Sequence, residues 1–273
     1  ALEYDRDEKF NLELLRYLGE MGLLGITASE EFGGAGLDAV ASVIVHEELS
    51  ASDPGFALAY LAHSMLFVNN LAYNGNEEQK ARILPKVCSG EWIGAMAMSE
   101  PDAGSSVTDL QTSATPDGDD FLINGTKVFG TNSVEANLFL IYLRFGPGID
   151  GIGSAIVEKG TEGFDIGRSY QYMNGESWSP LYFNDCRIPT TNILLGPGGF
   201  KKQISGFNVE RLGNAARAVA VGKKAFVEAC EHAKTRKQFG RDLCEFQGLQ
   251  WKFSEMQMRL EAAQLLLMRA VTN

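Results

Sequence analysis

The stretch "DFLINGTKVFGTN" (120–132) marks a change in the chain from helical to β character. Apolar and polar residues alternate along it, which is the period of a half-buried strand, and its Asn-Gly pair is a strong signal for a hairpin turn. Further short strands follow in "LFLIYLRF" (138–145), "GSAIVEK" (153–159) and "SPLYFNDCRIP" (179–189). We therefore expect a central β-barrel or sandwich domain over 92–198, ending near a glycine-rich loop.

Both flanks of this β region carry helical patterns. In "FNLELLRYLGEMGLLG" (10–25) apolar residues recur every three or four positions, which predicts a helical N-terminal domain over 1–91. Two long amphipathic helices, 201–236 and 245–272, are expected in a C-terminal domain over 199–273. Their apolar stripes need more helices to cover them. We therefore expect an α+β multidomain chain whose C-terminal helical bundle is completed by another subunit, or is present only in part.

Composition and residue spacing argue against several classes of function. The net charge of -11 argues against binding to nucleic acid or to an anionic membrane surface. No apolar run approaches the roughly 20 residues that span a bilayer. The four cysteines form no CxxC pair and the three histidines are scattered, so no metal site is expected. No export signal is visible at the N-terminus, which favours a bacterial cytoplasm or, after removal of an import sequence, the mitochondrial matrix.

The segment "GAMAMSEPDAGSSVTDLQTSA" (94–114) is, by itself, a polar loop without a Walker or G-x-G-x-x-G pattern. Together with other segments, however, it resembles the acyl-CoA dehydrogenase family, in the family's order and at about its spacing over essentially the whole chain. Those segments are "EEFGGAGLD" (30–38), "NGTKVFGTN" (124–132), "FNDCRIP" (183–189), "RKQFG" (236–240) and "EFQ" (245–247). The resemblance implies a helical N-terminal domain, a central β domain and a C-terminal four-helix bundle.

The resemblance also implies a reaction. In this family a carboxylate removes the α proton of an acyl-CoA thioester while the β hydrogen leaves as hydride to N5 of FAD. An electron-transfer flavoprotein is the expected acceptor, and a homotetramer or dimer is the expected assembly. The same fold could serve an acyl-CoA oxidase, an enoyl-CoA reductase, a flavin monooxygenase or a non-catalytic scaffold. The length, branching and ring content of the acyl group stay open.

Individual positions follow from the family motifs. "AGSS" (103–106) departs from the family's commoner "AGSD", so an acidic group is absent at Ser106. The positions expected to hold the flavin ring are Met98, Ser99, Phe129 and Thr131. Those expected to reach the FAD of a neighbouring subunit are Arg236, Gln238 and Gln247. Those expected to contact the acyl-CoA are Ser105, Asn208 and Arg211.

Glu210 is the candidate base. Many family members carry the base later, in a "YEG"-type motif that is absent up to Asn273. A subset, as in isovaleryl-CoA and long-chain acyl-CoA dehydrogenases, instead places it on the first helix after the β domain, before an arginine, as in Glu210–Arg211. On a helix Glu210 would share a face with Gly213, Asn214 and Arg217, and the absent side chain at Gly213 is expected to leave space for substrate. An ordinary helix glutamate, with the base beyond Asn273, is the alternative.

Overall fold

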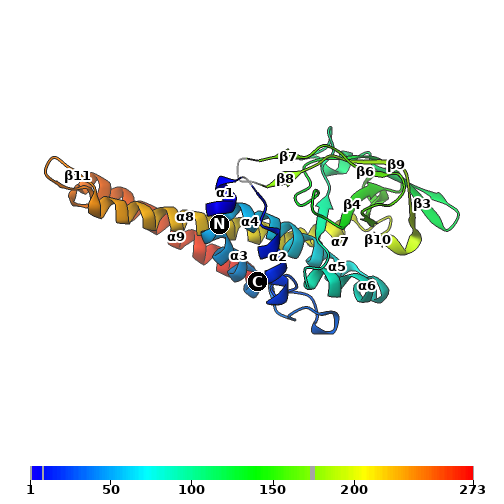
Figure 1. Ribbon diagram of the computed structural model, residues 1–273, viewed down its shortest axis with the longest axis horizontal. Helices are drawn as coiled ribbons and strands as arrows, with labels where there is room; N and C mark the ends of the chain where they lie inside the picture. The colour runs from blue at the N-terminus through cyan, green and yellow to red at the C-terminus, as the bar shows by residue number, and fades with distance from the viewer. Residues whose placement is uncertain (1, 8, 173–175, 273) are drawn as a thin grey trace.

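A computed structural model describes residues 2–7, 9–172 and 176–272 of the chain. Figure 1 shows three parts: a cluster of short helices, a β-sheet at one end, and a pair of long helices that projects away from the sheet. This arrangement confirms the predicted order of helical, β and helical segments. The sheet and the long helices both pack against the short helices, which therefore lie at the centre of the molecule.

The N-terminal helices begin at capping side chains. Asn11, Asp38, Asp53 and Asn76 each accept a hydrogen bond from a backbone N–H group in the first turn of the helix that follows. The segment from Leu61 to Val68 is π-helical and continues the preceding helix without a break. The elements are α1 (Leu2–Arg6), α2 (Leu12–Glu20), η1 (Glu30–Phe32), α3 (Ala39–Ser52), α4 (Pro54–Tyr60), η2 (Leu61–Val68), α5 (Asn69–Asn74) and α6 (Glu77–Cys88).

The central region is a mixed eight-stranded sheet with the order β10-β5-β4-β2-β3-β9-β6, and β1 pairs in parallel with β4. Among the described residues no pairing joins β10 to β6, so the sheet is open. The predicted β domain is thus present, as an open sheet and not as a closed barrel. Its strands are β1 (Gly94–Ala97), β2 (Ser113–Asp117), β3 (Asp120–Lys127), β4 (Leu138–Arg144), β5 (Ile152–Glu158), β6 (Phe164–Ile166), β9 (Leu181–Pro189) and β10 (Ile193–Leu195), with a separate hairpin of β7 (Tyr170–Gln171) and β8 (Ser177–Trp178).

The predicted hairpin turn at Asn124–Gly125 is wrong. Both residues lie inside β3, and the turn instead falls at Gly118, between β2 and β3. Gly125 has φ 149°, and a Cβ there would come within 2.4 Å of Thr112 Oγ1. The pairing with β9 shifts register at this point. The glycine therefore provides the backbone conformation of a β-bulge, where a side chain would not fit. An Asn-Gly pair supplies the same backbone freedom in a bulge as in a turn.

The C-terminal region differs from prediction in one respect. The helix expected over 201–236 is interrupted at Gly206, where a Cβ would meet Asn70 Oδ1 at 2.7 Å. The long helices α8 and α9 then run side by side to a short hairpin at the tip of the projection (Figure 1). The elements are α7 (Phe200–Ser205), α8 (Phe207–Thr235), β11 (Lys237–Gln238), β12 (Arg241–Asp242), η6 (Leu243–Glu245) and α9 (Gln247–Val271).

Candidate active site

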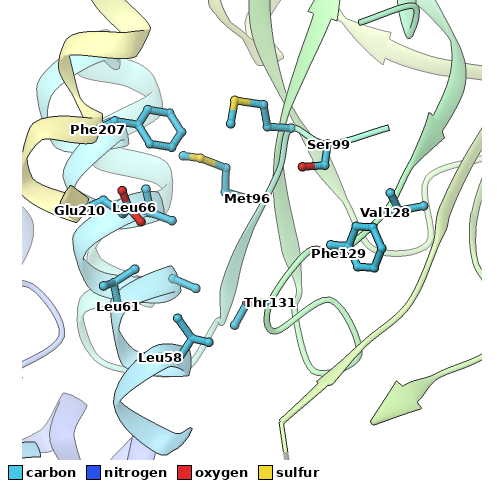
Figure 2. Close-up of a pocket in the computed structure, with 12 residues that line it drawn as sticks. Leu58, Leu61, Leu66, Met96, Ser99, Val128, Phe129, Thr131, Phe207 and Glu210 are labelled. Carbon is cyan, nitrogen blue, oxygen red and sulfur yellow. The ribbon is translucent and has the colours of Figure 1, made fainter. Parts of the chain in front are cut away.

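A pocket lies where α4, η2 and the start of α8 face the β domain. Figure 2 shows Glu210 and Phe207 on α8 across from the loops that follow β1 and β3. Five residues that the sequence proposed for the site, from distant parts of the chain, line this single pocket. The lining residues are Leu58, Leu61, Ala62, Leu66, Met96, Met98, Ser99, Val128, Phe129, Thr131, Phe207 and Glu210.

The helical wall of the pocket is apolar. Leu58 comes from α4, and Leu61 and Leu66 come from the π-helical segment η2. Single turns of π-helix often occur at functional sites, and here the whole of η2 (Leu61–Val68) is π-helical. These leucines are not among the site residues predicted from the sequence. The available signal was the apolar run "GFALAYLAHSMLFV" (55–68), which has no polar face and therefore predicts a helix buried on all sides.

The opposite wall is formed by loops and carries hydroxyl groups. Met98 and Ser99 directly follow β1, and Thr131 lies just beyond β3. Phe129 does not lie in a strand: it has φ 59°, in the left-handed region, and its side chain is 59 % exposed. Its ring centroid lies 4.5 Å from that of Trp178. A non-glycine residue with positive φ is uncommon, and such strain gathers at ligand sites.

The loop after β3 is tied to the helices. Asn132 also has a positive φ, 68°, and its buried side chain donates from Nδ2 to the carbonyl oxygen of Ala59, 2.8 Å away. This bond fixes the loop at the end of α4, whose Leu58 lines the pocket. The two walls are therefore joined by a direct polar contact.

Glu210 lies at the pocket in the first turn of α8 and is partly buried. Burial raises the pKa of its carboxyl group, against the opposing effects of Arg211, Asn214 and Arg217. Asn214 Nδ2 donates to Glu210 Oε1, and Arg217 Nη2 donates to Asn214 Oδ1 at 3.4 Å. The predicted shared face of these residues is thus confirmed. A carboxylate whose pKa is raised by burial, at the edge of an apolar pocket, is a candidate general base.

The expectation that Gly213 leaves space for a substrate is wrong. A Cβ at this position would come within 2.9 Å of Leu61 Cδ1 and of Met65 Sδ. The space beside the glycine is therefore filled by side chains of η2. Gly213 allows α8 to approach η2 closely, which brings Glu210 onto the same pocket as Leu61.

The residues proposed to reach a neighbouring FAD do not join this pocket. Arg236, Gln238 and Gln247 are exposed and lie at the hairpin end of the α8–α9 pair, far from the sheet in Figure 1. Beside them Phe239 is 94 % exposed with φ 52°. The exposure of this aromatic side chain could not be predicted, because a phenylalanine in a turn gives no periodic signal in the sequence.

The three residues proposed to contact acyl-CoA are all exposed and do not line the pocket. Asn208 and Arg211 flank Glu210 on α8, and Arg211 Nη1 donates to Asn208 Oδ1 at 3.1 Å. Ser105 lies in the turn after Glu100. All three residues therefore lie outside the pocket, on the surface of the protein.

Among the residues that the structure describes, no three His, Cys, Asp or Glu side chains are grouped as a metal site would require. Across the same described residues, none of the helices combines the length and apolar character needed to cross a bilayer.

Comparison with known proteins gives the family. The chain matches the acyl-CoA dehydrogenase N-terminal domain over residues 1–91, the middle domain over 95–186 and the C-terminal domain over 197–273. It is 38% identical over 275 residues to the short-chain-specific acyl-CoA dehydrogenase of Clostridium acetobutylicum, covering 99% of this chain and 73% of that protein. It is 38% identical over 271 residues to mitochondrial isovaleryl-CoA dehydrogenase of Pongo abelii, covering 96% and 64%.

Solved structures of similar fold indicate the same family. Butyryl-CoA dehydrogenase of Megasphaera elsdenii has a TM-score of 0.94 and 32% identity, covering 100% of this chain and 73% of that one. A FAD complex of PigA has a TM-score of 0.95 and 29% identity, covering 98% and 72%. A chain in a structure of the electron-transferring flavoprotein of Acidaminococcus fermentans has a TM-score of 0.94 and 34% identity, covering 99% and 72%. The protein therefore belongs to the acyl-CoA dehydrogenase family of FAD-dependent oxidoreductases.

Proposed function

We propose that this protein dehydrogenates an acyl-CoA thioester between the α and β carbons, with Glu210 as the base. One observation carries the proposal: a partly buried carboxylate faces, across one apolar pocket, the loop residues that match the family's flavin positions (Figure 2). FAD, when bound, supplies the acceptor for the β hydrogen. The chain itself must then hold the cofactor, orient the acyl group and take the α proton.

The loop wall fits a flavin ring. Ser99 and Thr131 offer hydroxyl groups to the polar edge of such a ring, while Phe129 and Met98 offer apolar surface. Phe129 needs no rearrangement for this role because its side chain is already more than half exposed. The combination of apolar surface with a few hydroxyl groups is typical of cofactor pockets.

The helical wall fits an acyl chain. Leu58, Leu61 and Leu66 offer an apolar surface next to Glu210. Met65 and Leu61 fill the space beside Gly213, which closes the pocket in that direction. We therefore propose a short straight or branched acyl group, in keeping with the names of the short-chain and isovaleryl-CoA relatives. Ser105, Asn208 and Arg211 would contact the part of the CoA that lies outside the pocket.

The environment of Glu210 suits a base. Partial burial raises the pKa of its carboxyl group, while Asn214 donates to Oε1, one of the oxygens that carry the charge before the proton is taken. Arg217 in turn donates to the amide oxygen of Asn214, which directs the NH₂ group of that amide towards Glu210. Burial of Glu210 therefore favours proton transfer to its carboxylate, while the hydrogen bond from Asn214 fixes the position of that carboxylate.

The proposal also covers the subunit assembly and the electron acceptor. We propose that the exposed end of the α8–α9 pair, with Arg236, Gln238 and Gln247, contacts the FAD of a neighbouring subunit in a homodimer or homotetramer. An electron-transferring flavoprotein is the proposed acceptor, in line with the similar chain in a structure of such a flavoprotein. We place domain boundaries at 91/92 and 198/199, and the protein in a bacterial cytoplasm or a mitochondrial matrix.

Anaerobic titration of the FAD-loaded protein with butyryl-CoA and isovaleryl-CoA tests this function. We expect the visible flavin absorbance to bleach, and to return on addition of an electron-transferring flavoprotein more rapidly than on exposure to air. Rapid return in air would instead indicate an acyl-CoA oxidase. Bound FAD that no acyl-CoA bleaches would contradict the proposal.

A further inference from the structure

A buried ion pair lies behind the loop wall of the pocket. Lys127, the last residue of β3, is 0 % exposed, and its Nζ lies 2.8 Å from Oε1 of the buried Glu100. The same ammonium donates to the carbonyl oxygen of Met98 at 3.0 Å. Neither charged residue lines the pocket, so the pair would not itself touch a ligand there.

Glu100 extends the network into a third segment. Its Oε2 accepts from the backbone N–H of Gln111 at 2.6 Å, and its Oε1 accepts from that of Thr112 at 2.9 Å. A backbone bond from Val128 N to Ser99 O, 2.9 Å long, runs beside the ion pair. The loop after β1, the start of β2 and the end of β3 are therefore connected through one carboxylate and one ammonium.

Stability alone gives a weak reason for such a pair. Taking two charges out of water is costly, and well-packed apolar replacements of buried pairs are often equally stable. Burial lowers the pKa of Lys127 to about 8, although Glu100 opposes this shift. Burial would also raise the pKa of Glu100, but Lys127 and the hydrogen bonds hold it below its usual value. Both groups are therefore charged at neutral pH, although burying two charges costs desolvation free energy.

The position of the pair offers another reason. Met98 and Ser99 directly precede Glu100, and Val128 and Phe129 directly follow Lys127, so each charge is next to pocket-lining residues. Phe129 needs support because its positive φ is strained. Three bonds fix this region: the ion pair, the bond to the Met98 carbonyl and the Val128–Ser99 bond. Rotation of either loop would break at least one of them.

We propose that the Lys127–Glu100 pair is a positioning device that holds the two flavin-facing loops together and so sets the affinity of the pocket for FAD. The proposal rests on the proposed function, because it takes FAD as the ligand of this pocket. It assigns Lys127 and Glu100 as positioning residues, which act through Met98, Ser99 and Phe129.

The test compares FAD binding by the cofactor-free wild-type protein and by the double variant Lys127→Met/Glu100→Gln, using quenching of flavin fluorescence. The double change removes both charges together, so no unpaired charge stays buried. We expect the Kd for FAD to rise by about tenfold or more, because preorganisation of the loops is lost. The unfolding midpoint of the cofactor-free protein should stay close to that of the wild type.

A matched control is available on the same sheet. Arg187 pairs with Asp117 between β9 and β2, with both side chains about half exposed. Arg187→Met/Asp117→Asn should leave the Kd for FAD unchanged. Should the double variant at the buried pair not fold, Lys127→Gln/Glu100→Gln, which also removes both charges but keeps polar groups beside the backbone partners, is measured in its place and should likewise raise the Kd for FAD.

The outcomes separate the two proposals. A wild-type protein that binds no FAD would overturn the proposed function. A wild-type protein that binds FAD, with a variant that binds it equally tightly, would overturn only the positioning role. A variant that loses affinity only in proportion to its loss of unfolding stability would also overturn that role, because the pair would then be purely structural.

Discussion

The two ends of α8 lie in opposite surroundings. The first half packs against α3 and η2 and buries Gly213, Ala216, Val219 and Ala220. The second half projects from the molecule with α9 beside it, and leaves Val227 54 % exposed. One continuous helix thus supplies a closely packed wall at its start and an apolar surface open to solvent at its far end.

This difference shows how surroundings decide the role of similar residues. Glu210 and Glu228 are both glutamates on the same helix. Glu210 is partly buried beside leucines and has a raised pKa, whereas Glu228 is exposed and lies 3.6 Å from Lys224 in an i,i+4 pair. Four predictions test the contrast between the two ends, from the largest expected effect to the smallest.

The largest effect is expected from Glu210→Gln. The amide cannot accept the α proton, so the rate of flavin reduction by acyl-CoA should fall by about 10²–10⁴-fold. Rapid-mixing absorbance under anaerobic conditions measures this rate. Glu228→Gln is the matched control and should leave the rate unchanged. Reduction by the Glu210 variant at a rate similar to that of the wild type would show that another group is the base.

The next effect is a loss of stability in acid from buried histidines near the packed end. His46 on α3 is fully buried and stacks on Tyr60, and neither of its ring nitrogens has a hydrogen-bond partner among the described residues. Burial, with a smaller effect of Arg217, lowers its pKa from 6.5 to about 4. Burial likewise lowers the pKa of His63 to about 4, although its ring bonds to Val87 O and Gly94 N oppose this.

Stability is expected to fall in acid because the unfolded state takes up more protons than the folded state. Between pH 6.5 and 4 the unfolded state binds more protons at these histidines than the folded state, so stability falls as the pH falls through this range. Each histidine should contribute a loss of about 3 kcal/mol over the whole interval. Urea unfolding at a series of pH values from 7 to 4 measures the loss, and His46→Phe should reduce it. An equal pH dependence in His46→Phe would contradict the assignment.

A smaller effect is expected from a pair of glycine substitutions on α8. Gly213→Ala places a Cβ within 3.0 Å of atoms of two packed residues, Leu61 and Met65, whereas Gly222→Ala meets only Leu260 Cδ2, at 2.8 Å. Alanine gains about 1 kcal/mol of helix propensity at either site, and overpacking costs about 1–3 kcal/mol. We expect Gly213→Ala to destabilise the protein by about 1 kcal/mol and Gly222→Ala to be neutral or stabilising. Thermal unfolding measures both, and equal effects would contradict the contrast.

The smallest effect on folding is expected on the exposed face of α9. Trp251 and Met258 are about two-thirds exposed, so Trp251→Glu and Met258→Glu should change the free energy of unfolding within one chain by less than about 0.5 kcal/mol. If this face joins subunits, the same changes should shift the protein towards monomer. Sedimentation velocity measures this shift. An unchanged sedimentation coefficient would place the subunit interface elsewhere.

Much of the fold was predictable because its signals are local. Helical spacing in 10–25 and the β-type runs at 138–145 and 153–159 depend on near neighbours in sequence, and the structure confirms each. The Asn124–Gly125 turn failed because a glycine with positive φ fits a bulge as well as a turn. Only the neighbouring strand, β9, distinguishes the two.

The candidate site was predictable in part. Motif positions gave Met98, Ser99, Phe129, Thr131 and Glu210, which the structure brings onto one pocket. The leucines of the opposite wall were missed because an apolar helical run does not reveal which of its residues face a cavity.

The sequence by itself determined the order of the elements, the family and the candidate base, because these depend on residue types at fixed spacings. Only the tertiary structure decided that side chains of η2 fill the space beside Gly213 and that Lys127 forms an ion pair with Glu100. It also decided that Glu210 is partly buried, with a raised pKa, while Glu228 stays in water. These properties depend on contacts between residues far apart in the chain and on the water those contacts exclude.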